Sequence, residues 1–172
     1  MPTKTKIIEP KKNAKNVLIA TVGADKKAPK PKKVNLEYRV KSYFKYDSQL
    51  KKQFYVISIF TVKEFSSLNY EISVDVKKNK KNIDIHLLGL NTRQNFYMQA
   101  RTASCDLFFE DLYGEHIVSI IKQDGNTNQF VIDYNIFKKE IKLKEFILPK
   151  KTKSTTFSDV EIITNLFTFK GE

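Results

Sequence analysis

Cysteine, tryptophan and glycine are scarce in this chain of 172 residues, which has one, none and five of them respectively. A single thiol, Cys105, excludes a disulfide within the chain and a zinc site built from several cysteines. So few glycines leave no Gly-rich loop whose backbone N–H groups could hold a phosphate. We therefore expect no metal ion and no cofactor.

Long apolar runs are also missing, so we expect no membrane span and no membrane partner. The segment Val17–Ala24 follows several lysines, as the apolar part of a signal peptide would. Its apolar core, Val17–Ala20, is too short for that role and is diluted by Thr21 and Gly23. We expect a protein of the cytoplasm, or a component of a particle assembled there.

Arginine is rare among the 31 basic residues, with Arg39, Arg93 and Arg101 the only three. An AT-rich genome would favour lysine over arginine in the same way. Arginine is the better residue for bidentate contacts with bases and phosphates. Its scarcity disfavours sequence-specific recognition of nucleic acid but leaves non-specific phosphate contacts open.

Charge is concentrated at the start of the chain, because residues 1–33 hold ten lysines and two acids, a net +8 of the total +12. Pro10, Pro29 and Pro31 oppose helix formation, so this segment is expected to be an extended basic arm. Such an arm binds polyanions by releasing counterions. The expected polyanion-binding residues are Lys4, Lys6, Lys11, Lys12, Lys15, Lys26, Lys27, Lys30, Lys32 and Lys33.

The segment 34–148 has the period-two pattern of β-strands and is expected to be the folded domain. Apolar and polar residues alternate over Val34–Val40 and over Leu68–Val76, whereas Phe54–Val62 is apolar on both faces and is expected to be a central strand. Further strands are expected at Ile83–Leu87, Phe96–Ala100, Cys105–Phe109, His116–Ile121, Phe130–Tyr134 and around Ile141–Ile147.

Two turns indicate hairpins between neighbouring strands. Asp124-Gly125 is a strong hairpin signal, and the polar run Lys78–Asn82 is a second turn. About eight short strands with no alternating helices predict an all-β fold. We expect an antiparallel β-sandwich, with a small barrel as the alternative.

Residues 149–172 form a polar linker followed by an apolar segment. Ser158 and Glu161 fit a capping box for a short helix, with Phe157 and Ile162 as its hydrophobic staple. The Val, Ile, Thr and Phe content favours a strand instead, and both alternatives stay open. The apolar side chains must be buried on the domain or on a partner, and the expected docking residues are Phe157, Val160, Ile163 and Phe167.

Residues that could support catalysis or metal binding are few. The segments Asp106–His116 and Asp124–Asn128 carry oxygen donors, but strand alternation divides the first, and the second lacks the later ligands of a calcium loop. His86 and His116 are the only two histidines, and no serine has the context of a nucleophile. We expect a non-enzyme with no catalytic residues.

Aromatic residues are abundant, with 13 Phe and 8 Tyr, and some alternate with lysines. Lys41, Tyr43, Lys45 and Tyr55 are the expected platform for stacking unpaired bases. Core packing is the alternative use of these rings.

Two functions follow from these features. The first is a non-enzymatic structural protein that docks on other subunits, as a homo- or hetero-oligomer, in a capsid-like virion shell or a ribonucleoprotein. The second is non-specific binding of single-stranded nucleic acid through the lysine arm and the aromatic platform. A barrel enclosing a small apolar ligand is a third possibility.

Overall fold

The computed structural model describes residues 35–66, 68–93, 99–147 and 155–170. The chain divides into two units, Met1–Lys32 and Lys33–Glu172, and every described residue belongs to the second. The predicted arm and most of the predicted linker lie outside the described residues, as does most of the expected strand Phe96–Ala100.

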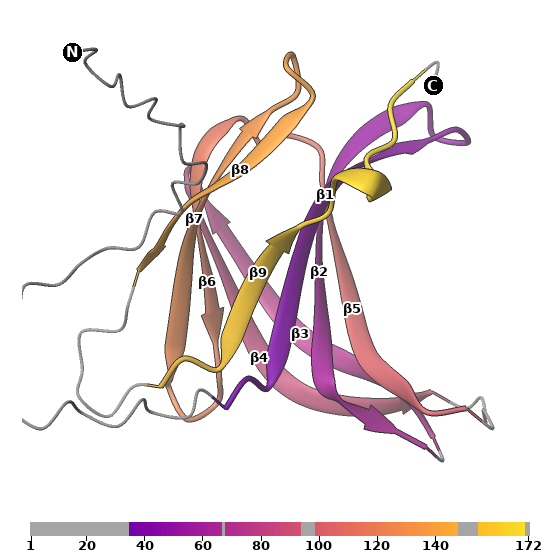
Figure 1. Ribbon diagram of the computed structural model, residues 1–172, viewed down its shortest axis with the longest axis vertical. Coiled ribbons are helices and arrows are strands. Elements are labelled where there is room, and N and C mark those ends of the chain that lie inside the picture. The colour runs from indigo at the N-terminus through magenta and orange to yellow at the C-terminus, as the bar shows by residue number, and fades with distance from the viewer. Residues whose placement is uncertain (1–34, 67, 94–98, 148–154, 171–172) are drawn as a thin grey trace, which may run out of the picture. The chain divides into compact units, whose positions relative to one another are not determined.

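The described residues confirm the all-β class, because they form nine strands and one short 3-10 helix (Figure 1). The elements are β1 (Tyr38–Asp47), β2 (Lys52–Phe65), β3 (Asn69–Asn79), β4 (Asn82–Arg93), β5 (Arg101–Phe109), β6 (Gly114–Ile121), β7 (Thr127–Asn135), β8 (Glu140–Ile147), β9 (Ser158–Ile162) and η1 (Thr164–Leu166).

The strands join in one sheet of order β8-β7-β6-β4-β3-β5-β2-β1-β9, which curls until it is nearly closed into a barrel (Figure 1). The expectation of purely antiparallel pairing is wrong at three places. The pairs β1/β9, β3/β5 and β4/β6 are parallel. Parallel neighbours arise from crossovers between strands distant in the sequence, and hydropathy periodicity carries no signal for them.

Both predicted hairpin turns are present. β3 and β4 are joined through Lys80 and Lys81, where Lys80 has a positive φ of 48°. β6 and β7 are joined around Asp124-Gly125, where the glycine has a φ of 80° that side chains other than glycine rarely adopt. The Asp124 carboxylate accepts the backbone N–H of Asn126 at 2.9 Å and so holds the turn.

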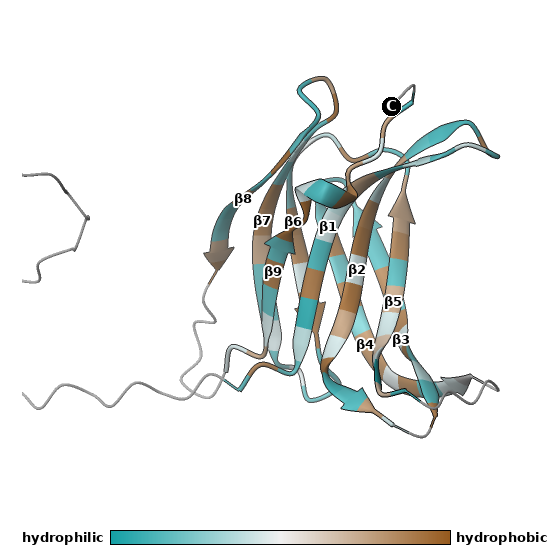
Figure 2. Cartoon of the chain, turned by 45° about the vertical axis from the view of Figure 1, so that its right-hand side comes forward, coloured by the Kyte–Doolittle hydropathy of each residue, from teal (hydrophilic) through white to brown (hydrophobic). Residues whose placement is uncertain are grey.

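Hydrophobic and hydrophilic residues alternate along several strands (Figure 2), and on strands such as β1 and β7 every second residue is buried. On β7 the inward residues Asn128, Phe130, Ile132 and Tyr134 are buried, while the residues between them are half-buried. Inward residues of the other strands complete the core, among them Phe44, Ile57, Ile59, Ile72, Ile83, Ile85, Val118 and Ile120.

The C-terminal segment is a strand where the capping box favoured a helix. The Ser158 hydroxyl, expected to cap a helix, instead donates to the Asn128 Oδ1 at 3.0 Å. The backbone carbonyl of Phe157 accepts the N–H groups of Glu37 and Tyr38, which aligns β9 in parallel with β1. Tertiary pairing therefore overrides a local capping signal of four residues.

Asn128 connects the two ends of the curled sheet. Its side chain is fully buried on β7, and its Oδ1 accepts the backbone N–H groups of Phe157 and Ser158, both at 2.9 Å. Its Nδ2 donates to the Thr155 carbonyl at 3.2 Å. β8 and β9 are the two terminal strands of the sheet and are not paired with each other. The Asn128 side chain therefore links β7, next to β8, to the start of β9 through hydrogen bonds.

The closing segment after β9 covers one end of the barrel. Phe167 and Phe169 lie 5.1 and 5.2 Å from the Phe44 ring, measured between ring centroids. The Thr168 N–H donates to the Phe44 carbonyl at 3.0 Å, and its hydroxyl accepts the Tyr46 N–H at 2.8 Å. The rings of Phe167 and Phe169 thus pack on their own domain.

We predict that Asn128→Ala lowers the free energy of unfolding by roughly 2–4 kcal/mol, because it leaves several buried N–H and O–H donors without an acceptor. Urea denaturation measures the loss, and hydrogen exchange of residues 155–163 shows whether β9 detaches. Asn91→Ala, on an exposed part of β4, is the matched control. Equal stability of the two variants would contradict a closing role for Asn128.

A second prediction concerns Tyr134, whose buried hydroxyl lies 3.2 Å from the Ser42 hydroxyl across the barrel. Burial raises the pKa of Tyr134 well above the usual 10.0, and the Ser42 hydrogen bond opposes this only in part. The folded state therefore favours the neutral phenol. Its contribution to stability is complete below pH 10 and is lost as the pH rises further.

In the parent, ionisation of Tyr134 in the unfolded state should lower the free energy of unfolding by up to about 1.4 kcal/mol per pH unit above pH 10. Tyr134→Phe should remove this decline. Denaturation at pH 9 to 11, taken as roughly bracketing the free phenol's titration, measures the slope. Tyr113→Phe, which removes a hydroxyl from a side chain that is 62% exposed, should keep it. An unchanged slope in Tyr134→Phe would show that other groups cause the decline.

Candidate functional site

The predicted platform residues of β1 lie together on the outer surface of the barrel. Lys41, Tyr43 and Lys45 alternate with the buried Val40, Ser42 and Phe44. Their common face is what the alternation predicted.

Tyr55 does not belong to this face. It is on the inward side of β2, only 6% exposed, and its ring packs 5.4 Å from Phe44 and 5.7 Å from Tyr134. Because Phe54–Val62 is apolar on both faces, the sequence carried no pattern from which the direction of Tyr55 could be read. Tyr55 is therefore a core residue in this structure.

Two phenylalanines that the sequence did not single out complete the outer face. The Lys41 Nζ lies 5.1 Å from the centroid of the Phe60 ring, and the Lys45 Nζ lies 5.3 Å from that of Phe108. Phe108 on β5 is 48% exposed. Only the register of β5 on β2, which places Phe108 beside Val56, brings this ring near β1. We call Lys41, Tyr43, Lys45, Phe60 and Phe108 the cationic face.

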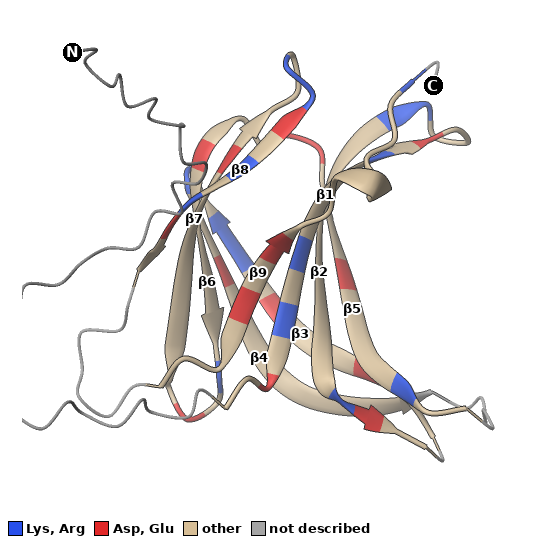
Figure 3. Cartoon of the chain, viewed as in Figure 1, with Lys and Arg blue, Asp and Glu red and all other residues tan. Residues whose placement is uncertain are grey.

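Acidic side chains lie beside the cationic face (Figure 3). On β9, Asp159 is opposite Arg39, with 4.0 Å between the Asp159 Oδ1 and the Arg39 Nε, and Glu161 is opposite Lys41. On β5, Asp106 accepts a hydrogen bond from the Ser58 hydroxyl at 2.5 Å. These carboxylates reduce the positive potential that a polyanion would meet on this surface.

Two of the acids near His116, Glu110 and Asp111, form ion pairs with lysines of other strands. Glu110 pairs with Lys52 at 3.0 Å, and the Lys78 hydrogen bond holds the pKa of Asp111 below its usual value. Among the described residues, no three His, Cys, Asp or Glu side chains are placed to bind one metal ion. His86 points outward from β4 while His116 is buried inside β6, so the two do not form a pair.

The expected docking residues of the C-terminal segment are largely occupied by the chain itself. Phe157 is 1% exposed, Phe167 packs on Phe44, and Ile163 is half-buried. Of the two alternatives that the sequence left open, these three side chains are covered by their own domain, and docking of this segment on a partner stays a prediction. Val160 differs, because it lines an open groove.

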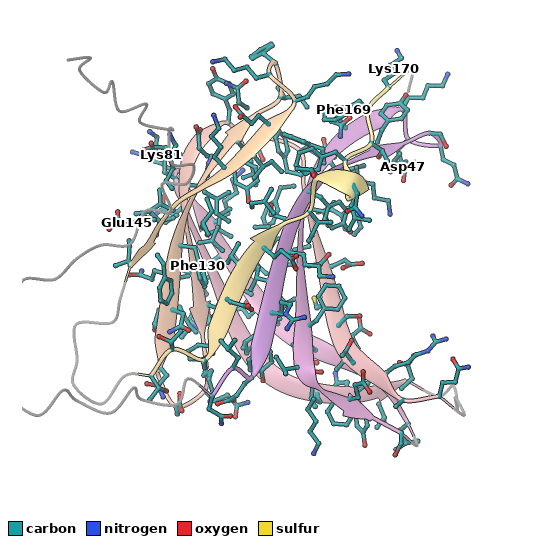
Figure 4. All side chains as sticks on the ribbon, viewed as in Figure 1. Asp47, Lys81, Phe130, Glu145, Phe169 and Lys170 are labelled. Atoms are coloured by element: carbon teal, nitrogen blue, oxygen red, sulfur yellow. The ribbon has the colours of Figure 1, made fainter. Side chains whose placement is uncertain are left out.

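This groove, which we call the seam groove, has a volume of about 320 Å³ and lies between the two terminal strands. Phe130 and Phe146 form one wall, with their rings stacked at 5.1 Å, and Val160 belongs to the opposite side. Figure 4 places Phe130 in the wall beside the seam. Leu143 of β8 also lines it and is 41% exposed, although it lies on the inward side of its strand.

The free edge of β8 borders the seam groove. β8 pairs with β7 on one side, and on its other side no described strand is paired with it. The exposed edge and the apolar groove together form the surface best suited to another polypeptide, because backbone groups and apolar side chains are available side by side.

No family model, no curated protein and no solved structure matches this sequence. Among the described residues, no helix has the length and hydropathy needed to cross a membrane.

Proposed function

We propose that this chain is a non-enzymatic assembly protein whose barrel joins other protein subunits through the free edge of β8. The observation that carries the proposal is this edge, with which no described strand is paired and which ends the sheet beside the apolar seam groove. An unpaired strand presents a row of N–H and C=O groups that a strand of another subunit can complete.

The side chains of the edge support the same proposal. Leu143 and Phe146 face inward, yet β9 does not cover them as a paired strand would, and Leu143 remains 41% exposed. Covering such residues contributes about 25 cal/mol per Å² of apolar surface buried. A docked subunit would provide this cover.

The basic arm fits an assembly role as well, although it lies outside the described residues. The arm has ten lysines in 33 residues, and their positive charge would be neutralised by a polyanion or by an acidic neighbouring subunit. A capsid-like shell or a ribonucleoprotein is the kind of particle in which a β-domain with such an arm would serve.

The proposal predicts that, in extracts of its native source, the chain belongs to a species larger than its own 20.1 kDa. Size-exclusion chromatography with detection of the chain measures this. Leu143→Glu should reduce the size, because the edge then presents a charge to an apolar contact. Leu166→Glu is the control, since Leu166 is 42% exposed on η1 and away from this edge. A monomer in the extract, or an assembly indifferent to Leu143→Glu, would overturn the proposal.

Binding of single-stranded nucleic acid is the second candidate. The observation that favours it is the cationic face, where Tyr43 and Phe108 flank Val56 and lysines lie over the neighbouring rings. Exposed aromatics beside cations stack bases without regard to sequence. The neighbouring carboxylates of Asp106, Asp159 and Glu161 oppose it, which is why we place it second.

This candidate predicts that Tyr43→Ala and Phe108→Ala each weaken binding of a single-stranded oligonucleotide by about 1–3 kcal/mol, with steep salt dependence. Fluorescence anisotropy measures the affinity. Tyr113→Ala, another exposed aromatic, should have no effect. If both variants bind as the parent does while removal of residues 1–33 abolishes binding, the arm alone acts and the face has no part.

A further inference from the structure

We infer that the subunit on the β8 edge is a second copy of this chain, paired antiparallel, β8 to β8, across a two-fold axis between Lys144 and Glu145. The inference rests on the proposed use of this edge and adds the identity and the register of the partner. It follows from the pattern of side chains along β8.

A β-bulge in β8 carries the argument. Ile132 is opposite Leu143 and Val131 is opposite Glu145, so Lys144 is an extra residue in the ladder. The Lys144 amine lies 3.8 Å from the Asp133 carboxylate, and Asp133 is an outward residue of β7. Lys144 and Glu145 are therefore consecutive residues that both face outward, and Figure 4 shows Glu145 on the outer side of β8.

Antiparallel pairing of two such strands matches the faces when Lys144 is opposite Glu145 of the partner copy. Leu143 then lies opposite the partner copy's Phe146, and both are inward residues. Lys142 lies opposite the partner copy's Ile147, and both are outward residues. The bulges of the two copies lie opposite each other. The alternation of inward and outward residues therefore stays matched between the two strands on both sides of the bulges.

The same register is complementary in charge. The two-fold axis creates two Lys144–Glu145 pairs between the copies, and opposite charges directly across an antiparallel pair stabilise it. A shift of one residue in either direction brings Lys144 opposite Lys144 or Glu145 opposite Glu145 of the partner copy. It also places inward residues opposite outward ones, so the register is specified by both charge and packing.

Lysines on an edge strand usually prevent pairing, because they bring like charges together and keep the edge in water. The adjacent glutamate changes this for a partner edge that places an acid opposite Lys144 and a base opposite Glu145, as a second copy of β8 does. A neutral or basic edge gains nothing from Lys144, whereas a second copy of β8 supplies a glutamate for each lysine. The edge is thus selective for its own sequence.

The test uses the purified full chain in sedimentation equilibrium. The parent should dimerise, and Lys144→Glu or Glu145→Lys should each weaken the dimer by about tenfold or more, because each creates two like-charge contacts. The double reversal K144E/E145K should restore the affinity to within about threefold of the parent. Lys142→Glu makes the same change in charge opposite an uncharged residue and is the matched control. Circular dichroism confirms that each variant is folded.

Mixing the two single variants tests the register itself. A K144E copy and an E145K copy present opposite charges at both contacts, so an equal mixture should form a mixed dimer although neither variant dimerises well alone. Native mass spectrometry with one variant labelled with ¹⁵N distinguishes the mixed dimer from the two homodimers.

Two results would overturn the inference. One is a parent chain that remains monomeric up to about 100 µM. The other is a dimer that is indifferent to these charges or is not recovered by mixing. In either case the assembly role would still stand if the native species is large and depends on Leu143, because the edge would then bind a different subunit.

Discussion

The buried side chain of Asn128 is the interaction on which the arrangement of this barrel depends. Its amide satisfies two backbone N–H groups, one hydroxyl and one carbonyl of the segment 155–158. A buried amide with all these partners is specific in position, because any displacement of β9 leaves donors unpaired in an apolar interior. It places Phe157 and starts β9 at Ser158. β9 therefore lies beside β1, and the C-terminal phenylalanines reach the barrel end.

Closure by a side chain differs from closure by a strand pair. A paired strand would satisfy the whole edge of β8, whereas the Asn128 amide and the Ser42–Tyr134 hydroxyl pair join the walls and leave that edge without a partner among the described strands. The apolar seam groove, the exposure of Leu143 and the accessible bulge all follow from this. The surface that we propose for assembly is thus a consequence of how the barrel closes.

The two faces of the sheet show how the aromatic residues divide between stability and surface. Inside, the rings of Tyr134, Tyr55 and Phe44 form a continuous series that the C-terminal rings extend. Outside, lysine ammonium groups lie over the rings of Phe60 and Phe108, and Phe108 is 48% exposed. Acids on β9 and β5 balance those lysines, so the charge that sets this protein apart is in its first 33 residues and not on the barrel.

The sequence by itself determined the all-β class, the two hairpins and the face shared by Lys41, Tyr43 and Lys45, and it located most of the described strands, although β1 begins at Tyr38 and not at Val34 as expected. These features depend on alternation and turn chemistry, which act over a few residues. Tertiary structure alone decided the parallel pairs, the inward direction of Tyr55 and the approach of Phe108. It also decided that 158–162 is a strand, because the Ser158 hydroxyl meets Asn128 across the barrel. These features depend on contacts between residues far apart in the chain, and local propensity cannot report a partner 30 residues away.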